Sequence, residues 1–128
     1  MRTRISIIAA AALSVLALTV AATAGAATNV HTASLSGSAA YPAANGKVKS
    51  SVDDGVRQVE GQLEDANALA GKRVTLLIRG KVVDTATVNR LGNARFAASG
   101  ATIPNVAAGN VTRVETTAGA LVASGRFG

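Results

Sequence analysis

The fold of this chain is decided by residues 47–64, which read KVKSSVDDGVRQVEGQLE. Apolar and polar residues alternate across 48–52 and again across 59–63, and Asp53-Asp54-Gly55 separates the two runs. A period of two places successive side chains on opposite faces of a strand, so that one face is buried and the other is in water. Asp-Gly between two such runs is a strong signal for a tight hairpin turn. The stretch therefore predicts two antiparallel strands.

The rest of the chain has the same character. It contains further short apolar or alternating runs at 32–41, 74–78, 82–88, 94–98, 111–116 and 120–127. Glycine-bearing turns separate them, at Gly80-Lys81, Leu91-Gly92-Asn93 and Thr117-Ala118-Gly119. The connection 65–73 allows one helical turn at 67–70, and the loop 100–110 is long enough to cross from one sheet to another. About seven or eight short strands predict an all-β, antiparallel sandwich or barrel, and we favour a Greek-key, immunoglobulin-like sandwich.

The predicted core is aliphatic and short of large side chains. Its expected members are Leu35, Val52, Val59, Leu63, Val74, Leu76, Ile78, Val82, Val88, Phe96, Val111, Val114, Leu121 and Phe127. Aromatic residues make up only 2% of the chain. We therefore expect the two phenylalanines to contribute more to stability than core residues usually do.

Composition excludes many chemistries. The 128 residues suit one small domain, and they include no cysteine and a single histidine. Disulfide scaffolds, thiolate metal sites and cysteine nucleophiles are excluded, and the usual sites with several histidines are excluded too. We assign no catalytic residue, no metal ligand and no cofactor from the sequence.

The N-terminus has the form of a secretory signal peptide. Two arginines lie within Met1-Arg2-Thr3-Arg4, an uncharged apolar run follows from 5 to 20, and small residues follow that. Cleavage after Ala24 or after Ala26 fits, and we favour the second. The predicted organisation is a signal peptide at 1–26, helical while it is attached, and one β-sandwich domain at 27–128. The mature domain carries eleven basic and seven acidic residues, a net charge of +4.

The chain resembles a group of small exported β-sandwich proteins of high-GC bacteria, most of which have no assigned function. The residues that carry the resemblance are Leu35-Ser36-Gly37, Ala40-Tyr41, Asp65-Ala66, 69–72, 74–88, 103–106 and 121–127. Exported CHRD-type domains are distantly similar through the Leu-Ser-Gly start, although their histidine-bearing strand motif has no match here. The resemblance covers nearly all of 27–128. It implies a fold and an exported location, and it supplies no catalytic residue.

The acidic residues are candidates for two kinds of site, a calcium site and a catalytic pair of carboxylates. Calcium needs six or more oxygens from a folded loop, and Asp53, Asp54, Glu60, Glu64 and Asp65 have no such loop spacing, so we interpret Asp-Asp-Gly as turn chemistry. Glu60 and Glu64 share one strand face about 13 Å apart, which is too far for a glycosidase-like pair. Asp84 completes the set of carboxylates that an exported hydrolase would use. We interpret these acids as a solvated surface.

Other polar residues have simpler interpretations. His31 is expected in an exposed N-terminal tail, and Ser34, Ser36 and Ser38 are expected on a strand surface. Asn110-Val111-Thr112 fits the N-x-T pattern, which we interpret as the end of a loop entering a strand.

Basic residues are the remaining candidates for binding. Six of them flank or follow the predicted strands: Lys47, Lys49, Lys72, Arg73, Arg79 and Lys81. Together they are candidates for contact with an anionic cell-wall polymer, and the alternative is that they serve solubility and protect strand edges. The export signal and the scarcity of aromatic residues argue against nucleic acid.

We expect a non-enzymatic module, secreted or associated with the cell envelope, that binds an envelope polymer or protein. We expect the chain to contact the membrane only transiently, through the signal peptide. The alternative is an exported carboxylate-dependent hydrolase.

Overall fold

The computed structural model describes residues 28–128. The predicted signal peptide lies outside these residues. The described chain forms eight strands and one short 3-10 turn, η2 (Asn67–Leu69). The strands are β2 (Thr28–Gly37), β3 (Asn45–Asp53), β4 (Val56–Glu64), β5 (Arg73–Ile78), β6 (Lys81–Thr87), β7 (Ala94–Ser99), β8 (Val111–Thr116) and β9 (Leu121–Arg126). Within residues 28–128, no helix has the length and apolar character needed to span a membrane.

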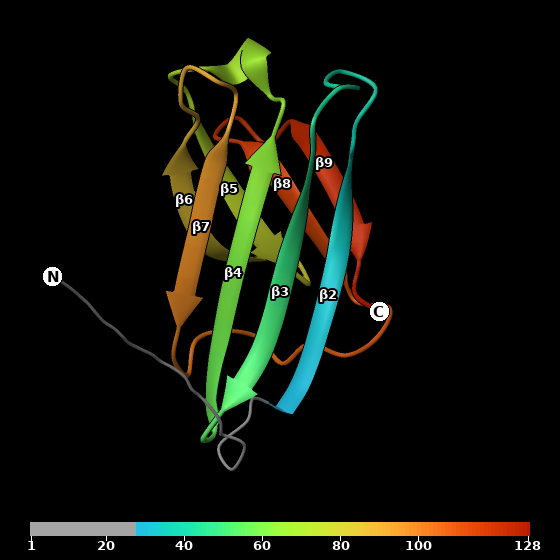
Figure 1. Cartoon of the computed structure of the whole chain (residues 1–128), viewed down its shortest axis with the longest axis vertical. Coiled ribbons are helices and arrows are strands. Elements are labelled where there is room, and N and C mark those ends of the chain that lie inside the picture. Colours follow the sequence, from blue (N-terminus) through green and yellow to red (C-terminus); the bar gives the residue numbers. More distant parts are fainter. Residues whose placement is uncertain (1–27) are drawn as a thin grey trace, which may run out of the picture.

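All eight strands belong to one antiparallel sheet, with the order β6-β5-β8-β9-β2-β3-β4-β7. In Figure 1, β7, β4, β3 and β2 form the near layer, and β6, β5, β8 and β9 lie behind them. The layers join where β2 pairs with β9, and this ladder is short, with Ser36 opposite Ser124 and Gly37 opposite Ala123. The sheet thus folds over on itself and is nearly closed.

Local sequence explains the hairpins. Asp54 and Gly55 both have positive φ, 51° and 78°, which makes the two-residue turn predicted between β3 and β4. The turn between β5 and β6 lies one residue earlier than predicted, because Arg79 (φ 54°) and Gly80 (φ 79°) are its central pair and Lys81 already belongs to β6. The single helical turn expected at 67–70 is confirmed as η2.

The first strand corrects the sequence analysis. We expected a loose tail up to Thr32 and a strand over 32–41, whereas β2 begins at Thr28 and ends at Gly37. The early residues are held because Thr28 pairs with Val52 of β3, and because the Gly128 amide donates to the Thr32 carbonyl at 3.0 Å. The pairing partners are distant in sequence, so the local composition of this segment gave no sign of them.

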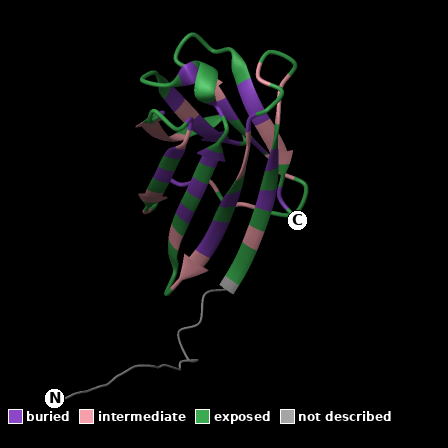
Figure 2. Cartoon of the chain, turned by 45° about the horizontal axis from the view of Figure 1, so that its top comes forward, coloured by how far each residue is buried: buried purple, intermediate pink, exposed green. Residues whose placement is uncertain are grey.

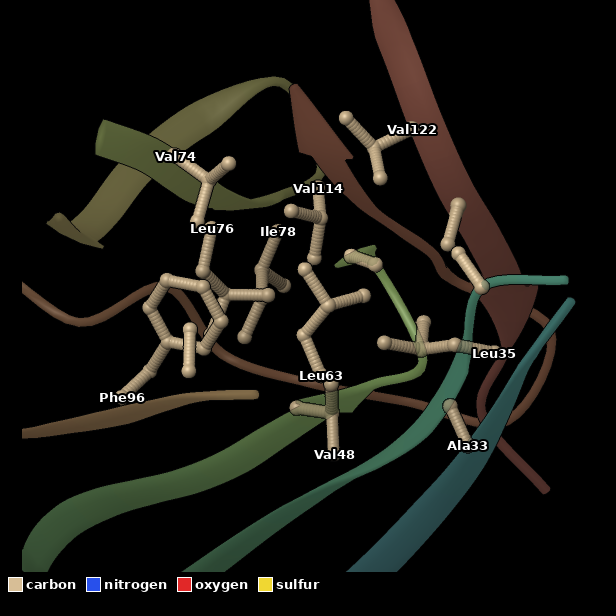
Figure 3. Close-up of a cluster of buried hydrophobic side chains, with 14 of the residues drawn as sticks. Ala33, Leu35, Val48, Leu63, Val74, Leu76, Ile78, Phe96, Val114 and Val122 are labelled. Atoms are coloured by element: carbon tan, nitrogen blue, oxygen red, sulfur yellow. The ribbon is translucent and has the colours of Figure 1, made fainter. Parts of the chain in front are cut away.

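The core is confirmed for ten of the fourteen predicted residues, Phe96 and Phe127 among them. Figure 2 shows buried and exposed residues alternating along the strands, and Figure 3 shows side chains from both layers meeting at Leu63. Three predictions were wrong, because Val82, Val111 and Leu121 are exposed. Val52 is only partly buried. The residues that the prediction omitted include Val48, Leu69, Leu77, Ile103 and Val122.

A side chain joins the two edges of the sheet. The edge strands β6 and β7 lie against each other without a main-chain ladder between them. The carboxylate of Asp84 on β6 bridges the gap, because its Oδ2 accepts the amide of Ala97 on β7 at 2.8 Å. Its Oδ1 accepts the neighbouring Thr85 amide, also at 2.8 Å. Two amide donors therefore fix this carboxylate at the closure of the sheet.

Replacing Asp84 with Ala should lower the free energy of unfolding by about 2 kcal/mol, because two charge-assisted hydrogen bonds are lost and one of them joins the edges. Urea unfolding measures the change. Glu60→Ala is the matched control, since Glu60 is an exposed carboxylate nearby whose side chain makes no hydrogen bond with any residue of 28–128, and its removal should change stability by about 0.5 kcal/mol or less. Equal losses for the two variants would show that the Asp84 bridge does not stabilise the fold.

Candidate functional site

The outer face of β3, β4 and β7 carries two polar rows. In the first row, Lys47 lies opposite Gln62, which lies opposite Arg95. In the second row, Lys49 lies opposite Glu60, and Glu60 lies opposite Ala97. Side chains directly opposite one another have Cβ atoms about 4.5–5.5 Å apart, so each row is a set of neighbours. The alternation seen in residues 47–64 therefore presents three cations on one surface.

A groove of about 480 Å³ runs over these rows. We call it the outer-face groove. It is lined by Lys47, Lys49, Glu60, Gly61, Gln62, Asp84, Arg95, Phe96 and Ala97. Ala97 has a small side chain and lies between longer ones, so the surface is hollowed where β7 meets Asp84 of β6. The groove thus lies at the closure of the sheet, where Asp84 joins β6 to β7.

The cations of the groove have no side-chain partner within the described part of the chain. Across residues 28–128 the only ion pair joins Arg113 to Glu115, at 2.9 Å. The side chains of Lys47, Lys49 and Arg95 make no hydrogen bond or ion pair with any other described residue. Unpaired cations around a concave surface attract anions and raise their local concentration.

Two carboxylates also line this groove, Glu60 and Asp84. A carboxylate-dependent hydrolase needs such a pair, with one of the two removed from water to act as an acid. Glu60 is exposed. Asp84 is half-buried, but each of its oxygens already accepts a main-chain amide. In this groove, Asp84 therefore holds the sheet together and Glu60 remains a solvated anion.

The six basic residues proposed from the sequence fall into separate groups. Lys47 and Lys49 lie together on β3, whereas the other four belong to the β5–β6 half of the sheet. Lys72 and Arg73 lie at the start of β5, and Arg79 and Lys81 flank its far end, roughly 17–20 Å away at 3.3 Å per residue. Nη1 of Arg79 also donates to the main-chain carbonyl of Asn105 at 3.2 Å. The six residues do not form one continuous stripe.

Sequence reasoning missed Arg95 as a member of the basic cluster. The hairpin turn at 54–55 already sets Lys47 opposite Gln62, since antiparallel partners count outward from the turn. No comparable turn joins β4 to β7, because η2, β5 and β6 intervene in the chain. Arg95 therefore reaches the groove through a non-local pairing that only the structure reveals.

The other polar candidates have structural roles. Ser34 and Ser36 are exposed on β2, and the Ser38 hydroxyl donates to the Leu121 carbonyl at 2.8 Å. Asn110 ends the loop before β8, as predicted, and Thr112 is fully buried with its hydroxyl donating to the Leu77 carbonyl at 2.8 Å. Among the described residues, no three histidine, aspartate or glutamate side chains gather in a way that would hold a metal ion.

Comparison with known proteins gives no family for this chain. A scan against models of protein families finds no match, and a search of curated proteins finds none. The functional argument therefore rests on the geometry of the surface.

Proposed function

We propose that the protein is an exported, non-enzymatic binding module whose outer-face groove takes an anionic polymer of the cell envelope. One observation carries the proposal: Lys47, Lys49 and Arg95 surround a groove of about 480 Å³ and have no partner among the described residues. Phosphate and carboxylate groups are the partners that such cations recognise. A groove that runs over β3, β4 and β7 is suited to an extended chain carrying repeated charges.

Location and fold class are part of the same proposal. The basic start, the apolar run and the small residues of 1–26 support export, which places the domain of 27–128 outside the cell or in its envelope. The two four-stranded layers and the short ladder between β2 and β9 support a Greek-key, immunoglobulin-like sandwich. A small exported β-sandwich of this type agrees with the group that the sequence resembles.

Sedimentation with purified bacterial cell wall tests the proposal. The domain should pellet with the wall at about 0.1 M sodium chloride and largely stay in solution at about 1 M, because the Debye length falls from ~10 Å to ~3 Å. The triple variant Lys47→Gln, Lys49→Gln, Arg95→Gln should bind about tenfold more weakly at the lower salt, with thermal stability almost unchanged, since exposed charges contribute little to folding.

A variant with the same change of charge separates the groove from the net charge of the domain. Lys72→Gln, Arg73→Gln, Arg90→Gln removes three exposed cations that lie away from the groove and make no side-chain hydrogen bond among the described residues. It should retain most of the binding. Equal weakening by both triple variants would assign the attraction to overall charge, and no pelleting at either salt concentration would reject an anionic polymer as the ligand.

A further inference from the structure

The inner face of the sheet changes from apolar to polar along the strands. The rows that contain Leu35 and Val48 are apolar and fully buried. In the next row His31 of β2 lies directly opposite Ser50 of β3. Arg57 of β4 lies one row further on. The polar groups of the interior are thus gathered at one end of the sheet.

A pocket of about 320 Å³ lies at this end. We call it the end pocket. His31, Ser50 and Arg57 line it from the strands, and Pro104, Asn105 and Val106 line it from the loop that crosses behind the lower parts of β4 and β3 (Figure 1). Ligand sites commonly combine an apolar lining with a few convergent polar groups, and a volume near 300 Å³ suits a small molecule.

Ser50 is the first sign that this pocket is built for a ligand. Ser50 is only 5% exposed, and its hydroxyl has no hydrogen-bond partner among the described residues. Buried hydroxyl groups nearly always have a partner, so one that lines a pocket without a partner calls for a bound group. Ser51, the next residue, is buried to a similar degree but does not line this pocket.

Arg57 supplies a fixed positive charge in the same pocket. Its Nε donates to Oδ1 of Asn105 at 2.7 Å, and its Nη1 donates to the carbonyls of Ile103 at 2.8 Å and Ala101 at 3.1 Å. These three bonds hold the guanidinium and the loop together, and they leave Nη2 without a partner in the described chain. A guanidinium held in this way keeps its remaining donors ready for an anion.

His31 is also oriented, contrary to the expectation of an unconstrained imidazole. Its Nδ1 lies 2.8 Å from the main-chain oxygen of Gly128. Because that oxygen only accepts, Nδ1 carries the proton, and the ring is held with Nε2 free of any described partner. The register of β2 against β3 shifts between Thr28 and His31, directly before this residue, and such irregularities of a strand often re-aim side chains beside sites.

We propose that the end pocket binds a small carboxylate with a short apolar body. The carboxylate accepts hydrogen bonds from Nη2 of Arg57 and from the Ser50 hydroxyl, which completes the bonding of both groups. The apolar body lies against Pro104 and Val106 of the loop. The site is separate from the outer-face groove, because the two lie on opposite faces of β3 and β4 and share no lining residue.

A titration of the full domain with butyrate, followed by proton NMR, tests the proposal. His31 is the only histidine in the chain, so its ring gives single, assignable signals beside the ligand. At fixed pH, and with sodium chloride as the ionic-strength control, butyrate should shift these signals to saturation with a roughly millimolar dissociation constant, the range expected for so few atoms. Butyramide has the same shape without the charge and should cause no saturable shift.

Two serine variants identify the site. Ser50→Ala should raise the dissociation constant for butyrate about tenfold or more, the effect of losing one hydrogen bond to a charged group. Ser51→Ala changes the neighbouring residue on the opposite face and should leave the constant unchanged. Three results would overturn the proposal: no saturable shift with butyrate, an equal shift with butyramide, or equal effects of the two serine variants. The comparison of butyrate with butyramide needs only the unaltered protein and decides the matter even if Ser50→Ala does not fold.

Discussion

Replacing Phe96 with Ala should lower the free energy of unfolding by about 3–5 kcal/mol, a large part of the roughly 5–15 kcal/mol that a domain of this size commonly has. Phe96 is 3% exposed and lies opposite Gly61 in the β4–β7 ladder. A Cβ placed on Gly61 would lie 3.5 Å from Cδ2 of Phe96 and 3.4 Å from Cδ2 of Leu76. The phenyl ring therefore covers the space that the glycine leaves, and its loss would open a cavity that no neighbour fills.

Urea unfolding of Phe96→Ala and Phe96→Leu measures this effect. Leu keeps most of the apolar volume, so its cost should be about 1.5 kcal/mol or less. A small loss for Phe96→Ala, comparable to that for Phe96→Leu, would mean that the sheet collapses around the cavity. The prediction would then be wrong, and the few large side chains of this core would not have the importance assigned to them.

Period-two patterns predicted most of the strands, because alternation is a local property of the sequence. They failed where two apolar residues are adjacent, since such a pair does not say which member faces inward. At 121–122 we expected Leu121 in the core, but Val122 is buried and Leu121 is exposed. The pattern also failed at 111–112, where the inward position belongs to a threonine rather than to Val111, and the buried hydroxyl of Thr112 is satisfied by the Leu77 carbonyl across the ladder. At both places, pairing with a neighbouring strand decides which residue faces the core.

The candidate sites depend on the same distinction between local and non-local information. The hairpin register places Lys49 opposite Glu60, and this follows from the turn at Asp54-Gly55. The end pocket needs His31 beside Ser50, which requires the pairing of β2 with β3 and the register shift before His31. His31 is held by Gly128, 97 residues away in the chain. No local pattern in the sequence predicts that contact, which explains why this residue was placed in an exposed tail.

Two glycines permit the closest approaches of main chain in the sheet. A Cβ on Gly46 would lie 2.0 Å from the Gln62 carbonyl oxygen, and a Cβ on Gly125 would lie 2.1 Å from the Ser34 carbonyl oxygen. Real Cβ atoms do not come so close to main-chain oxygen, and neither oxygen can move without disturbing its own strand. Gly125 lies in β9 beside β2, where the two layers join, and Gly46 lies opposite Leu35 and Leu63 in the core. Gly125 therefore permits the join between the two layers, and Gly46 permits the close approach of β3 to β4.

Gly46→Ala and Gly125→Ala should each lower the free energy of unfolding by about 3 kcal/mol or more, because the added methyl group forces two strands apart.

Gly61→Ala is the matched control. It also adds a methyl group to a strand glycine, and Gly61 is the more deeply buried, but its nearest contact is 3.4 Å, an ordinary van der Waals distance. Alanine in a strand loses less conformational entropy on folding than glycine, and this gain offsets part of the cost of any crowding. Gly61→Ala should therefore lower the free energy of unfolding by less than about 1 kcal/mol. Urea unfolding of the three variants compares them directly. Equal losses would mean that any methyl group is harmful in this core, whereas losses confined to Gly46 and Gly125 would show that the nearly closed sheet requires these two main-chain contacts.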